Sequence, residues 1–334
     1  MNGNLDFNNK YLNKISNIVK DSPEYINGYY YYLNDLSITS RYSYINIVVN
    51  FMKFTNKDVA QLNFDDFLSY LSHIEYKENG EITTSSYKIS VYSALKRFCT
   101  YLYSSKKINE NYMLNVKRPK SIEFQSTIEK RNTGYLTKNE IKKYLYDVEN
   151  GVGTRKSITR QEEWRERDSL IVLIFLTTGI RCSALMKLDV NNINVRSKSL
   201  MVTDKGSKTK IYTISDEVMN MYYDWIKKRH LLLDGVKEDA LFISNQRTRM
   251  DQSSIYRIVK KYSKNIKGKN ITPHKLRATY GTQLYNSTKD IYFVQECMGH
   301  SNPKTTEIYI RDKKNTTQKA SSIISDIIGN NIDK

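Results

Sequence analysis

Proline is almost absent from this chain, and glycine is scarce. Only 4 prolines and 13 glycines occur in 334 residues, and these two residue types interrupt regular structure most strongly. Long stretches are therefore free to form helices, and the sequence predicts a mostly α-helical fold. At about 100 to 200 residues per domain, a chain of this length accommodates two domains.

The first third of the chain predicts a helical domain over residues 23–115, after an Asn-rich N-terminal extension over residues 1–22. Apolar side chains recur there at helical spacing. The extension is too short to fold alone, since a segment usually needs about 40 residues for that. The predicted helices span 23–34, 42–54, 64–74 and a stretch that opens after Thr84.

A charged segment without periodicity, residues 116–134, predicts a linker to a second domain over residues 135–312. That domain opens with Thr137 and Glu140, which are spaced as a capping box at the start of a helix. Residues 313–334 are expected to form a C-terminal helix or tail.

The second domain predicts helices around a small antiparallel sheet. Residues 168–178 form a nearly all-apolar helix that would be buried on every side, and Gly179 can adopt the positive φ that ends it. Between 193 and 214 the hydrophobic period switches towards two, which predicts strands and a hairpin with Lys205 in its turn. The fold class is therefore mostly α with a small antiparallel β-sheet.

The charge balance points to a polyanionic partner. Lys and Arg number 53 against 35 Asp and Glu, a formal net charge of +18, and nucleic acid is the polyanion that this favours. A membrane partner is not expected, because the longest apolar run, 170–176, is far below the roughly 20 residues of a spanning helix.

Positive charge clusters in two regions. No acidic residue lies between Asp251 and Asp290, and a second basic region begins on the fourth predicted helix. Basic surfaces in both domains suggest that they grip one DNA duplex. The candidate DNA-binding residues are Lys88, Lys96, Arg97, Lys117 and Arg118 in the first domain, and Arg257, Lys260 and Lys261 in the second.

The cysteines indicate neither a disulfide framework nor a metal cage. Cys99, Cys182 and Cys297 are odd in number, widely spaced and free of any CxxC pair. The N-terminus lacks the apolar segment of a secretory signal. The sequence therefore predicts a cytoplasmic protein without a metal site.

Five short motifs whose side chains could take part in a reaction follow one another in the second domain. Taken singly, each occurs often by chance, and an HxxR pair alone is more simply a capping histidine with a surface arginine. Their order and spacing are more specific, with nine positions from the Gly-His to the last tyrosine. They are Thr178-Gly179-Ile180-Arg181, Lys205-Gly206, His274 with Arg277, Gly299-His300, and Tyr309.

In this order the five elements resemble the tyrosine recombinase (phage integrase) family. The resemblance implies an N-terminal core-binding domain of SAM-like helical type and a C-terminal α+β catalytic domain, the simple two-domain architecture of Xer and Cre-like recombinases. It also implies cleavage and rejoining of specific DNA sites through a 3′-phosphotyrosine intermediate and a Holliday junction. No metal, ATP or other cofactor is needed.

The chemistry of a phosphodiester explains these residue types. Charge grows on the non-bridging oxygens in the transition state, so cations must be positioned there in advance. Arg181 and Arg277 offer planar forks that match phosphate oxygens, and His300 adds a donor. Tyr309 must lose a proton to attack, and His274 is the candidate to accept it.

The resemblance implies that Lys205 is the general acid that protonates the departing 5′ oxygen. Lys208 and Lys210 are close enough in sequence to compete for this role. One position departs from the family pattern, because Ala184 stands where the family has an acidic residue that is thought to support the HxxR histidine. Cys182, beside Arg181, is interpreted as a small buried thiol and not as a nucleophile.

The expected partner is double-stranded DNA at specific recombination sites. Recombinases of this family act as tetramers on two duplexes, so we expect a homotetramer in the synaptic complex and a monomer or dimer when free. The Ile-rich segment 321–328 is suited to docking on a neighbouring protomer. The composition fits a bacterial cytoplasm and a mobile element or chromosome as substrate. Two alternatives stay open: a DNA-relaxing enzyme of the type IB topoisomerase kind, and a catalytically silent DNA-binding protein.

Overall fold

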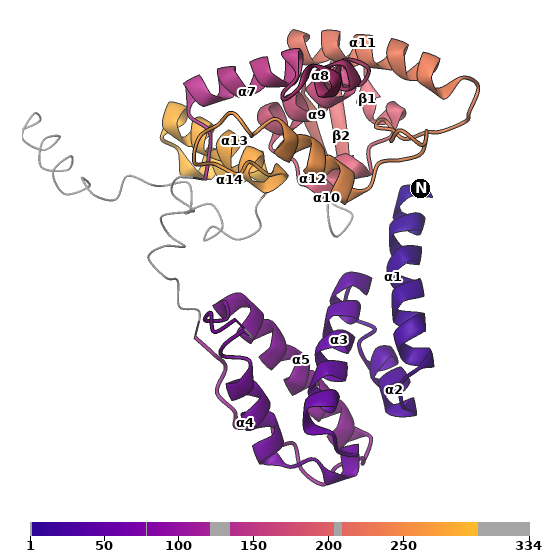
Figure 1. Cartoon of the computed structure of the whole chain (residues 1–334), viewed down its shortest axis with the longest axis vertical. Helices are drawn as coiled ribbons and strands as arrows, with labels where there is room; N and C mark the ends of the chain where they lie inside the picture. Colours follow the sequence, from indigo (N-terminus) through magenta and orange to yellow (C-terminus); the bar gives the residue numbers. More distant parts are fainter. Residues whose placement is uncertain (1, 78, 121–133, 204–208, 300–334) are drawn as a thin grey trace, which may run out of the picture. The chain divides into compact units, whose positions relative to one another are not determined.

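The computed structural model describes residues 2–77, 79–120, 134–203 and 209–299. The chain divides into two compact units, Met1–Thr127 and Ile128–Lys334 (Figure 1). The boundary falls inside the predicted linker, of which residues 121–133 lie outside the described part, so the domain limits stay a prediction. The fold class is confirmed: both units are built mainly from helices, and one small antiparallel sheet lies in the second.

Among its described residues, the N-terminal unit contains the four predicted helices and one more. Ser37 and Thr84 begin α3 and α5 as N-caps, their side chains accepting hydrogen bonds from the backbone N–H groups of Ser40 and Tyr87. The elements are α1 (Asn2–Lys20), α2 (Glu24–Tyr32), α3 (Ile38–Thr55), a short 3₁₀ turn (Val59–Gln61), α4 (Phe64–His73) and α5 (Ser85–Ser104).

The prediction that the first helix begins at Pro23 is wrong. Helix α1 occupies most of the predicted extension and packs against α2 and α3. Ile15 is 2% exposed within the core, and the ring of Tyr11 lies edge-on to that of Tyr42, 5.4 Å between centroids. Ile15, Ile18 and Val19 form an apolar stripe. The surrounding asparagines make the segment polar on average, so its composition does not reveal this stripe.

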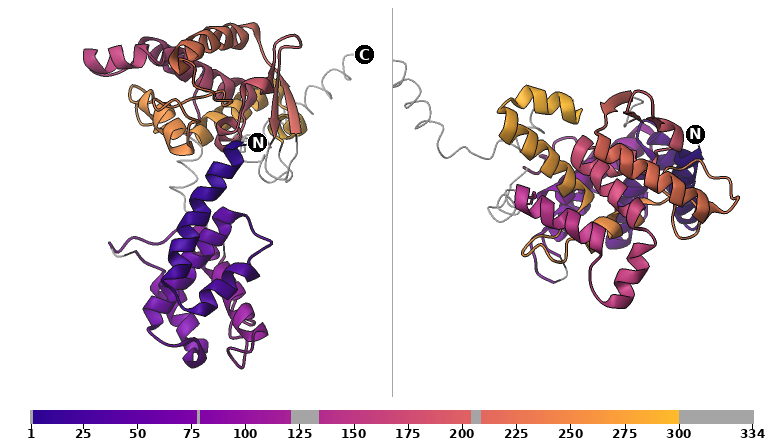
Figure 2. Two further views of the ribbon diagram at one scale, coloured as in Figure 1. Left: turned by 90° about the vertical axis from the view of Figure 1, so that its right-hand side faces the viewer. Right: turned by 90° about the horizontal axis from the view of Figure 1, so that it is seen from above.

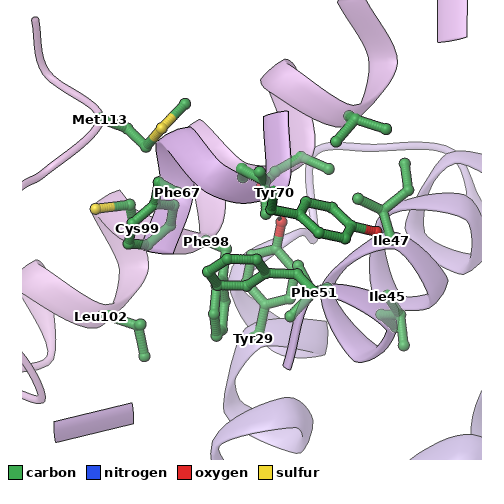
Figure 3. Packing of buried hydrophobic residues seen from close by; sticks show 14 of the residues in the cluster. Tyr29, Ile45, Ile47, Phe51, Phe67, Tyr70, Phe98, Cys99, Leu102 and Met113 are labelled. Atoms are coloured by element: carbon green, nitrogen blue, oxygen red, sulfur yellow. Dashed lines mark hydrogen bonds between the residues drawn. The ribbon is translucent and has the colours of Figure 1, made fainter. Parts of the chain in front are cut away.

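Aromatic side chains fill the core of the N-terminal unit (Figure 3). Phe51 of α3 packs on Phe67 of α4, with ring centroids 4.8 Å apart. Tyr29 of α2 is fully buried against Phe98 of α5, and its hydroxyl donates to the carbonyl of Ala94, 3.0 Å away. These contacts fix α5, which carries several of the predicted DNA-binding residues, against the rest of the unit.

The C-terminal unit is a set of helices around α9. The predicted capping box is confirmed at the start of α7, where Thr137 and Glu140 each accept from the other's backbone N–H. The charged helix α8 was not predicted. The elements are α7 (Lys138–Asn150), α8 (Arg155–Glu162), α9 (Arg165–Thr178), α10 (Cys182–Met186), a 3₁₀ turn (Val190–Asn192), β1 (Ile193–Asn194), β2 (Ser199–Thr203), β3 (Thr209–Thr213), α11 (Asp216–Leu233), α12 (Gln252–Lys261), α13 (Pro273–Thr288) and α14 (Ile291–Met298).

Helix α9 is the buried helix that the sequence predicts. It packs against α7, α11, α12 and α13, and most of its residues are inaccessible to solvent. Gly179 ends it with φ at +60°. A Cβ built on Gly179 would lie 2.3 Å from a ring carbon of Tyr280 on α13, so the backbone angle favours glycine there and the close helix packing leaves no room for a side chain. Arg181 follows two residues later, at the N-cap of α10.

The sheet has the order β1-β2-β3, antiparallel throughout, and Val202 pairs with Lys210. In β3 the side chains alternate, so that Lys210 and Tyr212 are half-buried on one face while Ile211 is exposed on the other. The hairpin turn, residues 204–208, lies outside the described part. So does the predicted C-terminal helix or tail, residues 313–334.

Candidate active site

Arg277 lies at the junction of three helix ends. It is on the first turns of α13 and is 4% exposed. One η nitrogen donates to the carbonyl of Gly179 at the end of α9, and the other to the carbonyl of Met298 at the end of α14, 2.6 Å away. A guanidinium carries five N–H donors, so these two bonds orient the group without using all its donors.

Arg181 and His274 approach the same place. The pKa of His274 is lowered from its ordinary value, first by partial desolvation and then by the positive charges of Arg277 and Arg181. The side chain of His274 nevertheless remains exposed to solvent. The structure thus brings together the arginine after the Thr-Gly turn and both members of the HxxR pair, as the sequence predicts.

The lowered pKa fits His274 for accepting a proton. A lowered pKa means that the neutral imidazole predominates at neutral pH. Arg181 and Arg277 are cations beside it, and they would favour an anionic phosphate group at the same position. The three side chains can therefore combine anion binding with base chemistry.

Two tyrosines lie among these cations, but both are held as neutral phenols. Burial is the first cause that raises the pKa of Tyr212 and of Tyr280 above the ordinary value, although the charges of nearby arginines oppose it. Tyr280 also hydrogen bonds with Cys297. Burial thus disfavours the phenolate form of both side chains.

Three hairpin lysines, Lys205, Lys208 and Lys210, are candidates for the acid role, and of these Lys210 lies within the described residues. Its ammonium donates to the carbonyls of Glu296 and Cys297, the latter 2.7 Å away, in the last turn of α14. Figure 2 (left) shows the strand pair β2-β3 beside α14. Lys205, Lys208, His300 and Tyr309 lie outside the described residues, so their roles stay predictions. Sequence reasoning could not have found the contact of Lys210, because its acceptors are backbone carbonyls distant in the chain.

The thiol of Cys182 is half-buried beside Arg181. Desolvation raises its pKa to about 12, so it stays protonated at neutral pH. Ala184 is buried on α10. Among the described residues, no cluster of three or more His, Cys, Asp or Glu side chains is placed to hold a metal ion.

Three of the predicted DNA-binding residues of the N-terminal unit line one open hollow. Lys96, Arg97 and Arg118 border a space of about 760 Å³ together with hydroxyl side chains. The charge of Arg97 has a counterion within the protein, because its two η nitrogens each donate to Asp35, 2.7 Å away. Lys117 is exposed outside this hollow, and Lys88 lies 4.0 Å from Glu75.

In the C-terminal unit, Arg257 and Lys260 are exposed on α12 and line a basic hollow of about 620 Å³. Lys261 differs from them. Its ammonium donates to Asp168, 2.9 Å away, and Asp168 is fully buried. Lys261 therefore has a structural partner within the protein, and its DNA-binding role stays a prediction.

Asp168 is the acceptor of a buried polar cluster that sequence reasoning missed. Arg167 donates to it through Nε and an η nitrogen, and the hydroxyl of Tyr262 donates at 2.8 Å. This raises the pKa of Tyr262 further, after the effect of burial. The cluster ties α9 to α12.

Within the described part of the chain, no helix combines the length and apolarity that crossing a bilayer demands.

Comparison with known proteins identifies relatives of this chain. The XerC tyrosine recombinase of Caldanaerobacter subterraneus subsp. tengcongensis is 29% identical over 315 residues, which cover 90% of this chain and 81% of the relative. The XerC tyrosine recombinase of Shewanella amazonensis is 31% identical over 221 residues, 65% of this chain and 67% of that protein. The XerS tyrosine recombinase of Streptococcus thermophilus is 32% identical over 178 residues, 51% of this chain and 50% of that protein.

Solved structures share the fold. The XerH site-specific recombinase in its post-cleavage complex with a palindromic difH substrate has a TM-score of 0.66 at 21% identity, covering 87% of this chain and 81% of that one. The Tn1549 transposon integrase in complex with transposon right end DNA has a TM-score of 0.57 at 18% identity, covering 85% and 91%. The family model of the phage integrase family matches residues 134–316, more than half of the chain. With Arg181, His274 and Arg277 converging inside that match, the chain belongs to the phage integrase family and is a tyrosine recombinase.

Proposed function

We propose that this recombinase cuts and rejoins DNA at specific sites by forming a 3′-phosphotyrosine link through Tyr309. The observation that carries the proposal is the convergence of Arg181, His274 and Arg277. Two guanidinium groups beside a histidine of lowered pKa match the needs of a phosphodiester that is attacked by a hydroxyl.

In the proposed reaction, Arg181, Arg277 and His300 bind the non-bridging oxygens, and His274 accepts the proton of Tyr309. The phenolate attacks phosphorus, the P–O5′ bond breaks, and Lys205 protonates the departing 5′ oxygen. The 5′ hydroxyl of another strand then attacks the phosphotyrosine and releases the enzyme. The bond energy is retained at each step, so the reaction needs no ATP.

The basic surfaces support DNA as the partner in both units. Lys96 and Arg118 border the hollow of the N-terminal unit, and Arg257 and Lys260 lie exposed on α12. Cations in such positions neutralise phosphates and release counterions. We propose that Lys88, Lys117 and Lys261 add to these contacts.

The assembly belongs to the same proposal. Four protomers would hold two duplexes and exchange strands through a Holliday junction, with segment 321–328 docked on a neighbouring protomer. Free protein would be a monomer or dimer. Its substrate would be a mobile element or chromosome in the bacterial cytoplasm.

Covalent trapping tests the function and locates the target site in the same experiment. The protein is incubated with fragmented genomic DNA of its source, and protein-linked strands are recovered after denaturation and sequenced. We expect one shared sequence with a 3′ linkage. Tyr309→Phe should give no adduct, whereas the control Tyr292→Phe, an exposed phenol on α14, should give the wild-type amount.

Two outcomes would redirect the assignment. An absence of adduct with wild-type protein would favour the silent DNA-binding alternative. Relaxation of supercoiled plasmid without exchange between two copies of the recovered site would favour a type IB topoisomerase-like activity.

A further inference from the structure

The last turn of α14 ends in carbonyls that two cations from other elements satisfy. Lys210 of β3 donates to Glu296 and Cys297, and Arg277 of α13 donates to Met298. Three consecutive carbonyls are thus held from outside the helix. Gly299, at φ +62°, then takes the chain out of the helix.

Physical reasons make this arrangement strong. The final carbonyls of a helix lack the usual partner four residues further along and form the negative end of its dipole. In α14 the carbonyl of Glu296 also accepts from the backbone N–H of Gly299, 3.1 Å away. An ammonium or guanidinium there makes charge-assisted bonds. The ammonium of Lys210 also lies 5.0 Å from the ring centroid of Tyr212, so the ring and the carbonyls together define its position.

In the sequence, this turn directly precedes the segment that carries two of the predicted catalytic residues. Gly299 follows Met298 directly, and His300 is the next residue. The end of α14 is therefore the point from which the chain continues to the predicted phosphate ligand His300 and, nine residues later, to Tyr309. Displacing this turn would displace the origin of the whole catalytic segment.

We propose that Lys210 is a positioning residue of the recombinase, which anchors the last turn of α14 to β3 and so fixes where the segment bearing His300 and Tyr309 begins. The inference rests on the proposed function. It assigns Lys210 a role different from that of the general acid, for which it competes with Lys205 on sequence grounds. Desolvation is the first cause that lowers the pKa of Lys210.

The first test compares cleavage by Lys210→Met, Lys210→Arg and wild type on a nicked suicide duplex of the trapped sequence, in single turnover. Methionine keeps much of the side-chain volume but donates nothing, and we expect cleavage about tenfold slower or worse, because small misplacements of reacting groups cost large factors in rate. Arginine can again donate to two carbonyls, and it should recover most of the rate. DNA affinity should be unchanged in both.

The matched control is Lys198→Met. Lys198 lies next to β2 of the same sheet and pairs with the exposed Asp216, 2.5 Å away. This variant should cleave at the wild-type rate. Equal rates for Lys210→Met and wild type would overturn the proposal.

A sulfur-substituted substrate separates positioning from acid catalysis. A bridging 5′ phosphorothiolate has a leaving group that needs no proton. It should restore cleavage by Lys205→Ala but leave Lys210→Met slow. Restoration of Lys210→Met by this substrate would make Lys210 an acid and overturn the positioning role.

Hydrogen exchange supplies a readout that is independent of cleavage. The amides of residues 297–299 should exchange faster in Lys210→Met than in wild type, while those of α9 keep their protection. Unchanged exchange at the end of α14 would contradict the proposal even if the wild-type protein cleaved no DNA. An inactive wild type combined with faster exchange would instead reject the proposed function and retain the anchoring role.

Discussion

The guanidinium of Arg277 donates to the carbonyl of Met298 across 2.6 Å, joining the first turns of α13 to the last residue of α14. The same group donates to Gly179 at the end of α9. A residue that is predicted to bind phosphate therefore also closes a junction between three helices. Binding chemistry and local structure depend on one side chain here.

Arg277→Lys should separate charge from geometry. Lysine keeps the positive charge but has no planar fork for two carbonyls. We expect cleavage to fall by about 10²-fold or more and the free energy of unfolding by about 1–3 kcal/mol. Single-turnover cleavage and urea unfolding measure the two effects, with Arg160→Lys on the exposed face of α8 as control. A variant as stable as wild type would show that the two carbonyl bonds contribute little to folding.

The pH dependence of cleavage should report His274. Its pKa is lowered below the ordinary value of 6.5 by desolvation, Arg277 and Arg181. A base must be neutral to accept a proton, so the rate should be level near neutral pH and fall only when the pH drops through this lowered pKa. Single-turnover rates from about pH 5 to 8 check this.

His274→Gln removes the titrating group and serves as the control for that profile. Its slower cleavage should lose the acidic inflection. An inflection in the wild-type profile above 6.5, or one that persists in His274→Gln, would assign the base to another residue.

Asp168→Asn should destabilise the C-terminal unit. The carboxylate is fully buried and accepts from Arg167, Lys261 and Tyr262. Removing the negative charge leaves buried Arg167 without its counterion, and breaking such a pair costs about 3–5 kcal/mol. Chemical unfolding followed by far-UV circular dichroism measures it.

Asp216→Asn is the control for Asp168→Asn, because Asp216 forms an exposed pair with Lys198. It should change stability by no more than about 1 kcal/mol. Similar losses for the two variants would mean that burial adds nothing to the importance of Asp168.

Salt dependence should distinguish phosphate contacts among the basic residues of the N-terminal unit. Lys96→Ala and Arg118→Ala should each weaken binding to all sequences and reduce the slope of log affinity against log salt by about 1. Fluorescence anisotropy with duplex DNA over a salt series measures this. Lys107→Ala, an exposed lysine that does not line the hollow, should leave the slope unchanged. An unaltered slope for Lys96→Ala and Arg118→Ala would remove the hollow from the DNA interface.

Local signals allowed much of the fold to be predicted from the sequence. Thr137 with Glu140, Thr84 and Gly179 set helix ends through contacts within a few residues, and each does so in the structure. Helix α1 escaped prediction because its few apolar residues stand among asparagines and gain their importance only by packing on α2 and α3.

The candidate site also contains some features that the sequence predicts and others that it does not. The order of motifs predicts that Arg181, His274 and Arg277 meet, and in the structure the charges of Arg277 and Arg181 help to lower the pKa of His274. Two sets of contacts could not be predicted: the bonds from Lys210 to carbonyls of α14, and the bond from Lys261 of α12 to Asp168. No residue type marks a backbone acceptor or a distant counterion. Such contacts arise only when the chain is folded.

The close approach of Tyr280 to Gly179 has an evolutionary consequence. The two positions should covary among descendants of this sequence. A side chain at 179 becomes admissible only after the ring at 280 has been exchanged for something smaller, and asparagine, which tolerates a left-handed backbone, is the first substitution to expect there. A joint change at the two positions would therefore mark altered packing of α9 against α13.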